Sequence, residues 1–143
     1  MRRLTAAAIR ARGGRTGGEL AKAARAALGP SAARAKGELL LVACARMDAA
    51  AALRLISEGA DPDCVDGDVW SSLIFASCYE ELDGVAARLI AAGAKLDLVD
   101  KYGGSALIWA CFNQRAATAL LLVEAGAALN QVAINSKSAL DWI

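Results

Sequence analysis

The feature that most constrains the fold is a phrase that returns along the chain at intervals of 34 and then 33 residues. Its three copies are LISEGADPDCVD from Leu55, LIAAGAKLDLVD from Leu89 and LVEAGAALNQVA from Leu122. A fixed period of this length indicates stacked structural repeats. Each repeat is too small to bury its apolar face alone, so its stability depends on the neighbouring repeat. The period therefore predicts a solenoid.

Each repeat is predicted to contain two short helices. A leucine lies fourteen residues after each repeated glycine, and a serine precedes that leucine by two places. A serine at that position can cap a helix through its hydroxyl group. The second helix has apolar residues at helical spacing and ends at the glycine, which tolerates the left-handed conformation of a helix terminus. The residues concerned are Gly59, Gly93 and Gly126, Leu73, Leu107 and Leu140, and Ser71, Ser105 and Ser138.

These repeats resemble the ankyrin repeat family over about residues 37–143. The family pattern D-x-x-G-x-T-P-L-x-x-A, a helix and then L-L-x-x-G-A-D-x-N is similar to DKYGGSALIWA, which leads to LLVEAGAALN. The resemblance implies an all-α solenoid of antiparallel helix pairs with short β-hairpin fingers. It divides the chain into repeats at about 37–65, 66–99 and 100–132 and a partial repeat at 133–143. Asp63, Asp97 and Asn130 would stand where the chain turns into each finger, and such side chains can hydrogen-bond to nearby backbone.

The sequence departs from the family pattern in three places. The T-P-L-H motif is replaced by S-S-L-I, S-A-L-I and S-A-L-D, so the histidine that commonly links loop to helix is missing and we expect less rigid fingers. The second repeat has one extra residue between Ala76 and Gly93, which predicts a lengthened turn between its helices. The fourth repeat stops at SALDWI, one helix short, so either the last repeat is half a unit or a longer protein continues.

The N-terminal part of the chain differs in charge from the rest. Residues 1–37 carry nine basic residues and one acidic residue, whereas residues 38–143 carry seven basic and fourteen acidic residues. We assign residues 1–30 to a basic, partly disordered head and residues 31–143 to the repeat domain. Residues 17–28 are expected to form a capping helix, because Thr16 and Glu19 have capping-box spacing and Gly29-Pro30 can stop a helix. The apolar face expected to cover the first repeat consists of Leu20, Ala24, Ala27 and Leu28.

The first twelve residues, MRRLTAAAIRAR, are rich in arginine and free of acids. A flexible basic tail, an organelle transit peptide and a contact with nucleic acid or membrane all remain open for this segment. We therefore expect a cytoplasmic protein, or a mitochondrial or plastid protein if the segment is a transit peptide. No apolar run approaches the roughly 18 residues that cross a bilayer, so no membrane span is expected.

The sequence offers little for catalysis or for binding a cofactor. There is no histidine, the side chain that most often transfers protons at neutral pH, and no serine lies in a nucleophile elbow. The acidic stretch DPDCVDGD lacks the arrangement of a calcium-binding loop. The cysteines include no CxxC pair and are expected to be reduced and structural; they are Cys44, Cys64, Cys78 and Cys111. We expect no enzyme activity, cofactor or metal site.

In the ankyrin family the finger tips and the exposed face of each first helix form a concave groove, so the resemblance implies a protein partner there. Four of the seven aromatic residues fall at these positions, and aromatic residues are enriched at the energetic centres of interfaces. Trp70 and Phe112 could instead pack between fingers and helices, and Trp109 lies on an inward-facing apolar run where core packing is expected. The candidate partner-binding residues are Asp68, Trp70, Tyr79, Lys101, Tyr102, Phe112, Asn113, Asn135 and Lys137.

These observations favour a non-catalytic interaction module, a scaffold or adaptor that binds a polypeptide through its concave surface. One alternative is an organelle-imported interaction protein with a cleavable N-terminal peptide. Another is a protein whose basic head contacts nucleic acid, although we do not expect nucleic acid as the main partner. We expect no small-molecule substrate and a monomeric chain.

Overall fold

The structure is a computed structural model of the 143-residue chain, and it describes residues 17–129. Residues 1–16 and 130–143 lie outside the described part. The expectations for the arginine-rich start of the chain, for the fourth repeat and for Asn135 and Lys137 therefore lie outside it as well.

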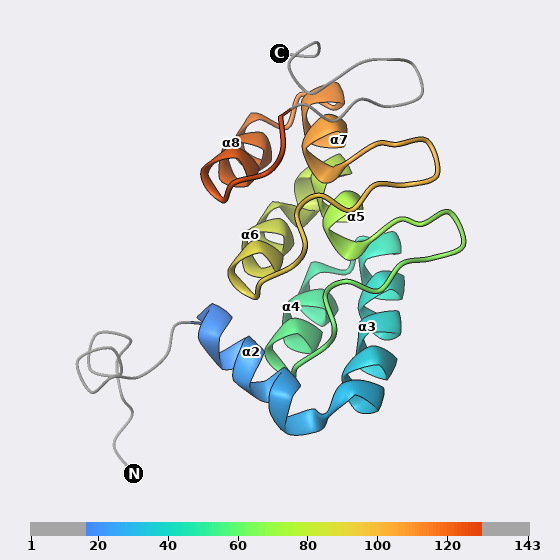
Figure 1. Cartoon of the computed structure of the whole chain (residues 1–143), viewed down its shortest axis with the longest axis vertical. Helices are drawn as coiled ribbons and strands as arrows, with labels where there is room; N and C mark the ends of the chain where they lie inside the picture. The colour runs from blue at the N-terminus through green and yellow to red at the C-terminus, as the bar shows by residue number, and fades with distance from the viewer. Residues whose placement is uncertain (1–16, 130–143) are drawn as a thin grey trace, which may run out of the picture.

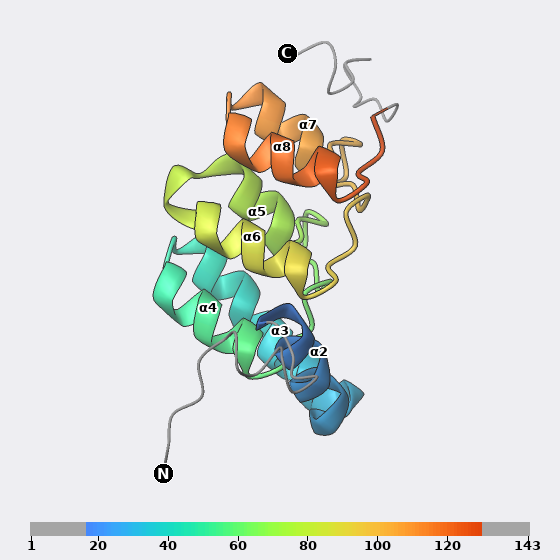
Figure 2. The same cartoon turned by 90° about the vertical axis from the view of Figure 1, so that its left-hand side faces the viewer.

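Three helix pairs stack on one another to form the predicted solenoid (Figure 1, Figure 2). The first helices of the pairs form one column, the second helices form another, and two loops project beside the first helices as fingers (Figure 1). The elements are α2 Gly17–Leu28, α3 Pro30–Ala45, α4 Ala49–Ser57, α5 Ser72–Cys78, η1 Glu80–Leu82, α6 Asp83–Ala91, α7 Ala106–Phe112 and α8 Ala116–Glu124. Within residues 17–129, no helix is both long and apolar enough to cross a membrane.

Each finger is a narrow hairpin held by a single antiparallel bridge. Val65 pairs with Ser71 in one finger, and Val99 pairs with Ser105 in the next. The described part of the chain is otherwise built from helices and loops, which confirms the all-α class with hairpin fingers that the sequence predicted.

The predicted helix caps are present in the second and third repeats. The Ser71 hydroxyl accepts a hydrogen bond from the backbone N–H of Ile74 at 3.2 Å, and Ser105 accepts one from Ile108 at 3.3 Å. At the other end of each repeat, Gly59, Gly93 and Gly126 have φ angles of 97°, 86° and 98°. These left-handed angles confirm the role of the repeated glycine, because residues with a Cβ adopt them only at a cost.

Leucines at equivalent positions form the continuous core between the two columns. Leu40 in α3, Leu73 in α5 and Leu107 in α7 are each at most 1% exposed. The second helices contribute Leu89 of α6 and Leu122 of α8, both completely buried. Each leucine belongs to one continuous apolar cluster, so the repeats depend on one another for burial.

The extra residue of the second repeat lies in the turn between its helices, as predicted. The first and third pairs turn through one non-glycine residue of left-handed conformation, Met47 with φ of 57° and Gln114 with φ of 58°. The second pair instead turns through the 3-10 helix η1, whose Leu82 is completely buried. The insertion therefore adds a core side chain to the turn and removes the need for a strained residue there.

Helix α2 is present over the predicted residues, but of the predicted packing face only Ala24 is partly buried, next to Gly59. Ala21 is its buried side chain, whereas Leu20, Ala27 and Leu28 are exposed. A Cβ placed on Gly59 would lie 2.6 Å from the backbone nitrogen of Arg25, so the glycine allows α2 to approach the end of α4 closely. Close approach requires small side chains at the contact, which is why the leucines point away.

The same helix extends beyond the first repeat. Its neighbours are α3, α4 and α6, and in Figure 1 it crosses the lower end of the column of second helices. A Cβ placed on Gly93 would lie 2.9 Å from the ε-carbon of Lys22. Lys22 therefore covers the C-terminal end of α6, where the helix dipole favours a positive charge.

The first turns of α3 occupy the place that a finger has in later repeats. Gly37 is buried against the loop that follows α4, and a Cβ on it would lie 2.6 Å from the carbonyl oxygen of Asp61 and from the sulfur of Cys64. The carbonyl of Ala33 also accepts a hydrogen bond from the Asp61 N–H at 2.9 Å. The first repeat thus uses a helix, and not a hairpin, to support the next finger.

Candidate functional site

The finger tips are shaped by one aspartate each. The Asp66 carboxylate accepts hydrogen bonds from the backbone N–H groups of Asp68 and Trp70, both at 2.9 Å. The Asp100 carboxylate accepts the equivalent bonds from Tyr102 and Gly104, also at 2.9 Å. Each carboxylate closes its tip by satisfying two backbone donors, and this fixes the direction of the neighbouring side chains.

A second pair of aspartates connects successive repeats. The Asp63 carboxylate accepts a hydrogen bond from the Lys95 N–H, and Asp97 accepts one from the Ala128 N–H, both at 2.8 Å. The sequence led us to expect contacts with nearby backbone, but these bonds span 32 and 31 residues. A local turn pattern in the sequence cannot reveal a partner in the next repeat. These two residues hold the finger bases in register.

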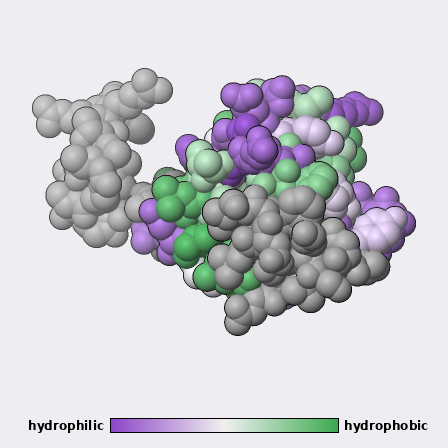
Figure 3. Space-filling view, turned by 90° about the horizontal axis from the view of Figure 1, so that it is seen from above, coloured by the Kyte–Doolittle hydropathy of each residue, from purple (hydrophilic) through white to green (hydrophobic). Residues whose placement is uncertain are grey.

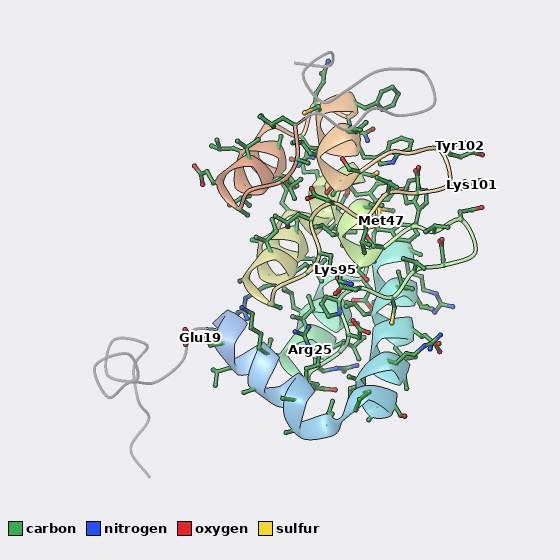
Figure 4. The ribbon with its side chains drawn as sticks, viewed as in Figure 1. Glu19, Arg25, Met47, Lys95, Lys101 and Tyr102 are labelled. Carbon is green, nitrogen blue, oxygen red and sulfur yellow. The ribbon has the colours of Figure 1, made fainter. Side chains whose placement is uncertain are left out.

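An ion pair joins the two fingers at their tips. The Lys101 ammonium lies 2.8 Å from the Asp68 carboxylate and 5.2 Å from the centre of the Tyr102 ring. The hydrogen bond to Asp68, followed by the contact with Tyr102, raises the pKa of Lys101 above its usual value. Figure 4 shows Lys101 and Tyr102 together at the end of a finger. Because both charged groups are largely exposed, the pair orients the tips more than it stabilises the fold.

Four aromatic rings form a row from the base of the fingers to the end of α7. The Trp70 ring lies 5.0 Å from that of Phe75 and 5.2 Å from that of Trp109, between ring centres. Trp109 in turn meets Phe112 edge to face at 5.7 Å. Such contacts contribute about 0.5–1.5 kcal/mol each beyond the burial of area. The row is therefore a rigid part of the surface.

Trp109 is the centre of this row, and its environment differs from the expected core. It is only partly buried, and its indole N–H donates a hydrogen bond to the Asp100 carboxylate at 2.9 Å. A Cβ on Gly104 would lie 2.6 Å from that indole nitrogen, so the glycine makes room for the ring. The expectation of core packing holds in part: Trp109 packs against the apolar core, but it stays partly exposed on the side of α7 that faces the finger. In the sequence, the two glycines before Ser105 are the feature that could have indicated a large ring packed against the finger.

The remaining predicted residues on this surface differ in exposure. Tyr102 is 51% exposed, Phe112 is 50% exposed and Tyr79 is 38% exposed. Trp70 is half-buried in the aromatic row, so both interpretations considered for it hold in part. The Asn113 amide donates a hydrogen bond to the Trp109 carbonyl at 2.9 Å and so caps the end of α7. Phe75 was not among the predicted residues, although its place in the repeat is that of Trp109.

The described residues bring together no reactive constellation on this surface. Among residues 17–129 there is no group of three cysteine, aspartate or glutamate side chains placed to hold a metal ion. Burial raises the pKa of the Cys44 and Cys78 thiols to about 12 and also raises that of Cys111. Thiols that stay protonated at neutral pH are poor nucleophiles. The chemistry of the surface is that of aromatic and charged contacts.

An open depression of about 600 Å³ lies away from the aromatic row, between α2, the start of α3 and the loop after α4. Arg25 and Arg34 line it together with Asp61 and Asp63. Charges of both signs at similar numbers give the depression no preference for an anion or a cation.

Comparison with protein families identifies the repeated unit. A family model described as ankyrin repeats, three copies, matches residues 40–133, about two thirds of the chain. The chain belongs to the ankyrin repeat family. No curated protein matches the chain at a significant level. Ankyrin repeats are in general modules of protein–protein interaction, and the finger and first-helix surface described above belongs to such an array.

Proposed function

We propose that this ankyrin repeat protein is a non-catalytic scaffold or adaptor that binds a polypeptide partner across its finger tips and first helices. The observation that carries the proposal is the exposure of Tyr102 and Phe112 on a surface that the Asp100 carboxylate and the aromatic row make rigid. Large side chains held in place lose little conformational freedom on binding, and they dominate the energetics of interfaces.

The partner would contact aromatic side chains and one ion pair. The aromatic side chains Tyr79, Tyr102 and Phe112 supply apolar area at separate points of the surface. The exposed Asp68–Lys101 pair offers one charge of each sign at the tips. An extended segment with apolar side chains and few charges fits this arrangement, because the exposed Asp68 and Lys101 side chains at the tips already pair with each other.

The test starts by identifying a partner through affinity capture with the full chain, followed by mass spectrometry. The affinity of that partner is then compared for the wild type, the Tyr102→Ala/Phe112→Ala double variant and Leu20→Ala. Leu20 is the control because it is 51% exposed on α2, away from the fingers. We expect the double variant to weaken binding by at least about thirtyfold, equivalent to about 2 kcal/mol, and Leu20→Ala to leave it unchanged.

Circular dichroism of each variant establishes that the fold is retained. Phe112 touches one ring of the aromatic row, so a modest loss of stability is expected in the double variant. A folded double variant that binds with unchanged affinity would show that the partner uses another face, and the proposal would then fail.

A further inference from the structure

The second helices expose an apolar surface on the side of the molecule opposite the fingers. Leu120 of α8 is 58% exposed, Leu121 is 36% exposed, and Ala117 beside them is also exposed. Figure 2 shows α6 and α8 side by side on this face, and Figure 3 shows hydrophobic residues gathered on the side where α8 lies. Leucines protruding at the surface of one helix are unusual for a face that meets only water.

The adjacent helix α6 presents small side chains on this face, where α8 presents leucines. Its exposed positions on this face include Gly84, Ala87 and Ala91, and nothing lies within 4 Å of a Cβ placed on Gly84. These residues lie 33 places before Ala117, Leu120 and Glu124, so they occupy equivalent positions in the preceding repeat. The face therefore combines a ridge on α8 with a shallow track on α6.

Two charged side chains border this ridge and track, one of each sign. Arg88 is exposed on α6, and Glu124 is exposed on α8. In the described part of the chain neither takes part in an ion pair. In its repeat, Arg88 occupies the position that Leu121 has in the next repeat. Glu124 lies about one helical turn after Leu121 on α8.

From this arrangement we propose that the outer face of α6 and α8 binds the same face of a second copy of the chain. A two-fold axis parallel to the helices and midway between them places α8 of each copy over α6 of the other. Leu120 then enters the track around Ala87, and Arg88 meets Glu124 of the other copy, twice in the dimer. One alignment of the two copies therefore fits the leucines against the small side chains and brings charges of opposite sign together.

The charges select this orientation over the alternative two-fold axis. An axis perpendicular to the helices would stack α8 on α8 and α6 on α6. That arrangement would bring the two Arg88 side chains to the same helix pair and leave Glu124 facing no cation. It would also oppose leucine with leucine and leave the track empty. Like charges across an interface disfavour it, so the parallel axis is the self-complementary solution.

The size of the face sets the expected affinity. A nine-residue helix is about 13 Å long and neighbouring helices are about 10 Å apart, so each copy contributes a few hundred Å². This is less than the roughly 800 Å² per partner of a standard stable interface. The dimer should be weak and reversible, with a dissociation constant on the order of tens to hundreds of micromolar. The fingers lie on the other side, so the dimer presents two free binding surfaces (Figure 1).

Sedimentation velocity of the full chain from about 5 μM to about 1 mM, in reducing buffer, tests the proposal in the range that the contact area predicts. We expect the sedimentation coefficient to rise with concentration. Leu120→Glu should raise the dissociation constant by at least about tenfold, because a buried leucine is replaced by a charge. Leu39→Glu is the matched control, since Leu39 is equally exposed at 58% but lies on α3. It should leave self-association unchanged.

A charge exchange tests the register. Arg88→Glu and Glu124→Arg should each raise the dissociation constant about fivefold, and the double variant should restore it to within about twofold of the wild type. A chain that stays monomeric at all concentrations overturns the proposal, as does a dimer that Leu120→Glu does not weaken. A dimer without rescue by the charge exchange overturns the proposed arrangement. The sequence alone led us to expect a monomer, and dilute conditions would give one.

Discussion

Asp100 should stabilise the third repeat more than its counterpart Asp66 stabilises the second. Asp100 is 4% exposed and accepts three hydrogen bonds, two from backbone N–H groups and one from the Trp109 indole, all at 2.9 Å. Asp66 accepts two such bonds and is half-buried. The residue at the place of Trp109 in the second repeat is Phe75, which has no donor. The chain therefore contains its own control.

The expected loss of unfolding free energy follows from the number of hydrogen-bond donors that each substitution leaves without an acceptor. A hydrogen bond to a charged group contributes about 1.5–3 kcal/mol, but water can reach the backbone of an exposed tip and replace part of that. We expect Asp100→Ala to cost about 3 kcal/mol and Asp66→Ala about 1.5 kcal/mol. Asp100→Asn should fall between them, because its amide oxygen can still serve the two backbone donors while its NH₂ group faces the indole N–H.

Urea unfolding followed by circular dichroism measures these differences without relying on the tryptophans. The decisive comparison is a double-mutant cycle with Trp109→Phe, which reproduces the natural pairing of the second repeat. We expect a coupling energy of about 1 kcal/mol between Asp100 and Trp109. Equal costs for the two alanine variants, or a coupling energy near zero, would refute the reasoning that the indole hydrogen bond distinguishes the repeats.

Three further predictions concern polar groups in or beside the core. Ser72→Ala should raise the free energy of unfolding by up to about 1 kcal/mol in urea titrations. Among the described residues, the buried Ser72 hydroxyl has no hydrogen-bond partner apart from a weak contact with the Cys44 thiol. A loss of stability would show that this contact is a stronger bond. Asp83→Ala should cost about 1–3 kcal/mol and lower the melting temperature, since Asp83 holds Arg115 at 2.6 Å and Thr118 at 3.1 Å; an unchanged melting temperature would contradict it. The raised pKa of Cys44 and Cys78 stabilises the fold below the ordinary thiol pKa near 9, and this contribution is lost as pH rises toward 12. Stability should therefore fall less steeply between about pH 9 and 11 in a variant with alanine at both positions than in the wild type.

The sequence predicts the repeat architecture well because periodicity records it directly. The caps of Ser71 and Ser105 and the left-handed glycines depend on neighbours within a few residues, so a local pattern is sufficient to identify them. The lengthened turn of the second repeat follows from counting residues between Ala76 and Gly93. Each of these features is determined inside one repeat.

Features that depend on two repeats could not be predicted in the same way. The partners of Asp63 and Asp97 lie about one repeat further along the chain, and nothing local distinguishes these aspartates from residues that close a turn. The packing face of α2 depends on its approach to Gly59, which an isolated helical wheel cannot show. The candidate surface was found by position in the family pattern, and the linkage of its aromatic residues into one row required the distances between rings.

The position of α2 has a consequence for how the array opens. In a simple solenoid each repeat contacts only its neighbours, so local unfolding can begin at either end. Because α2 contacts both α4 and α6, the first two helix pairs share a third element and should exchange their amide hydrogens as one cooperative unit. The pair α7 and α8 makes no comparable contact with α2 and should exchange faster. Protection would then decrease along the chain, and the finger that carries Lys101 and Tyr102 would lie at the boundary between the slow and the fast part.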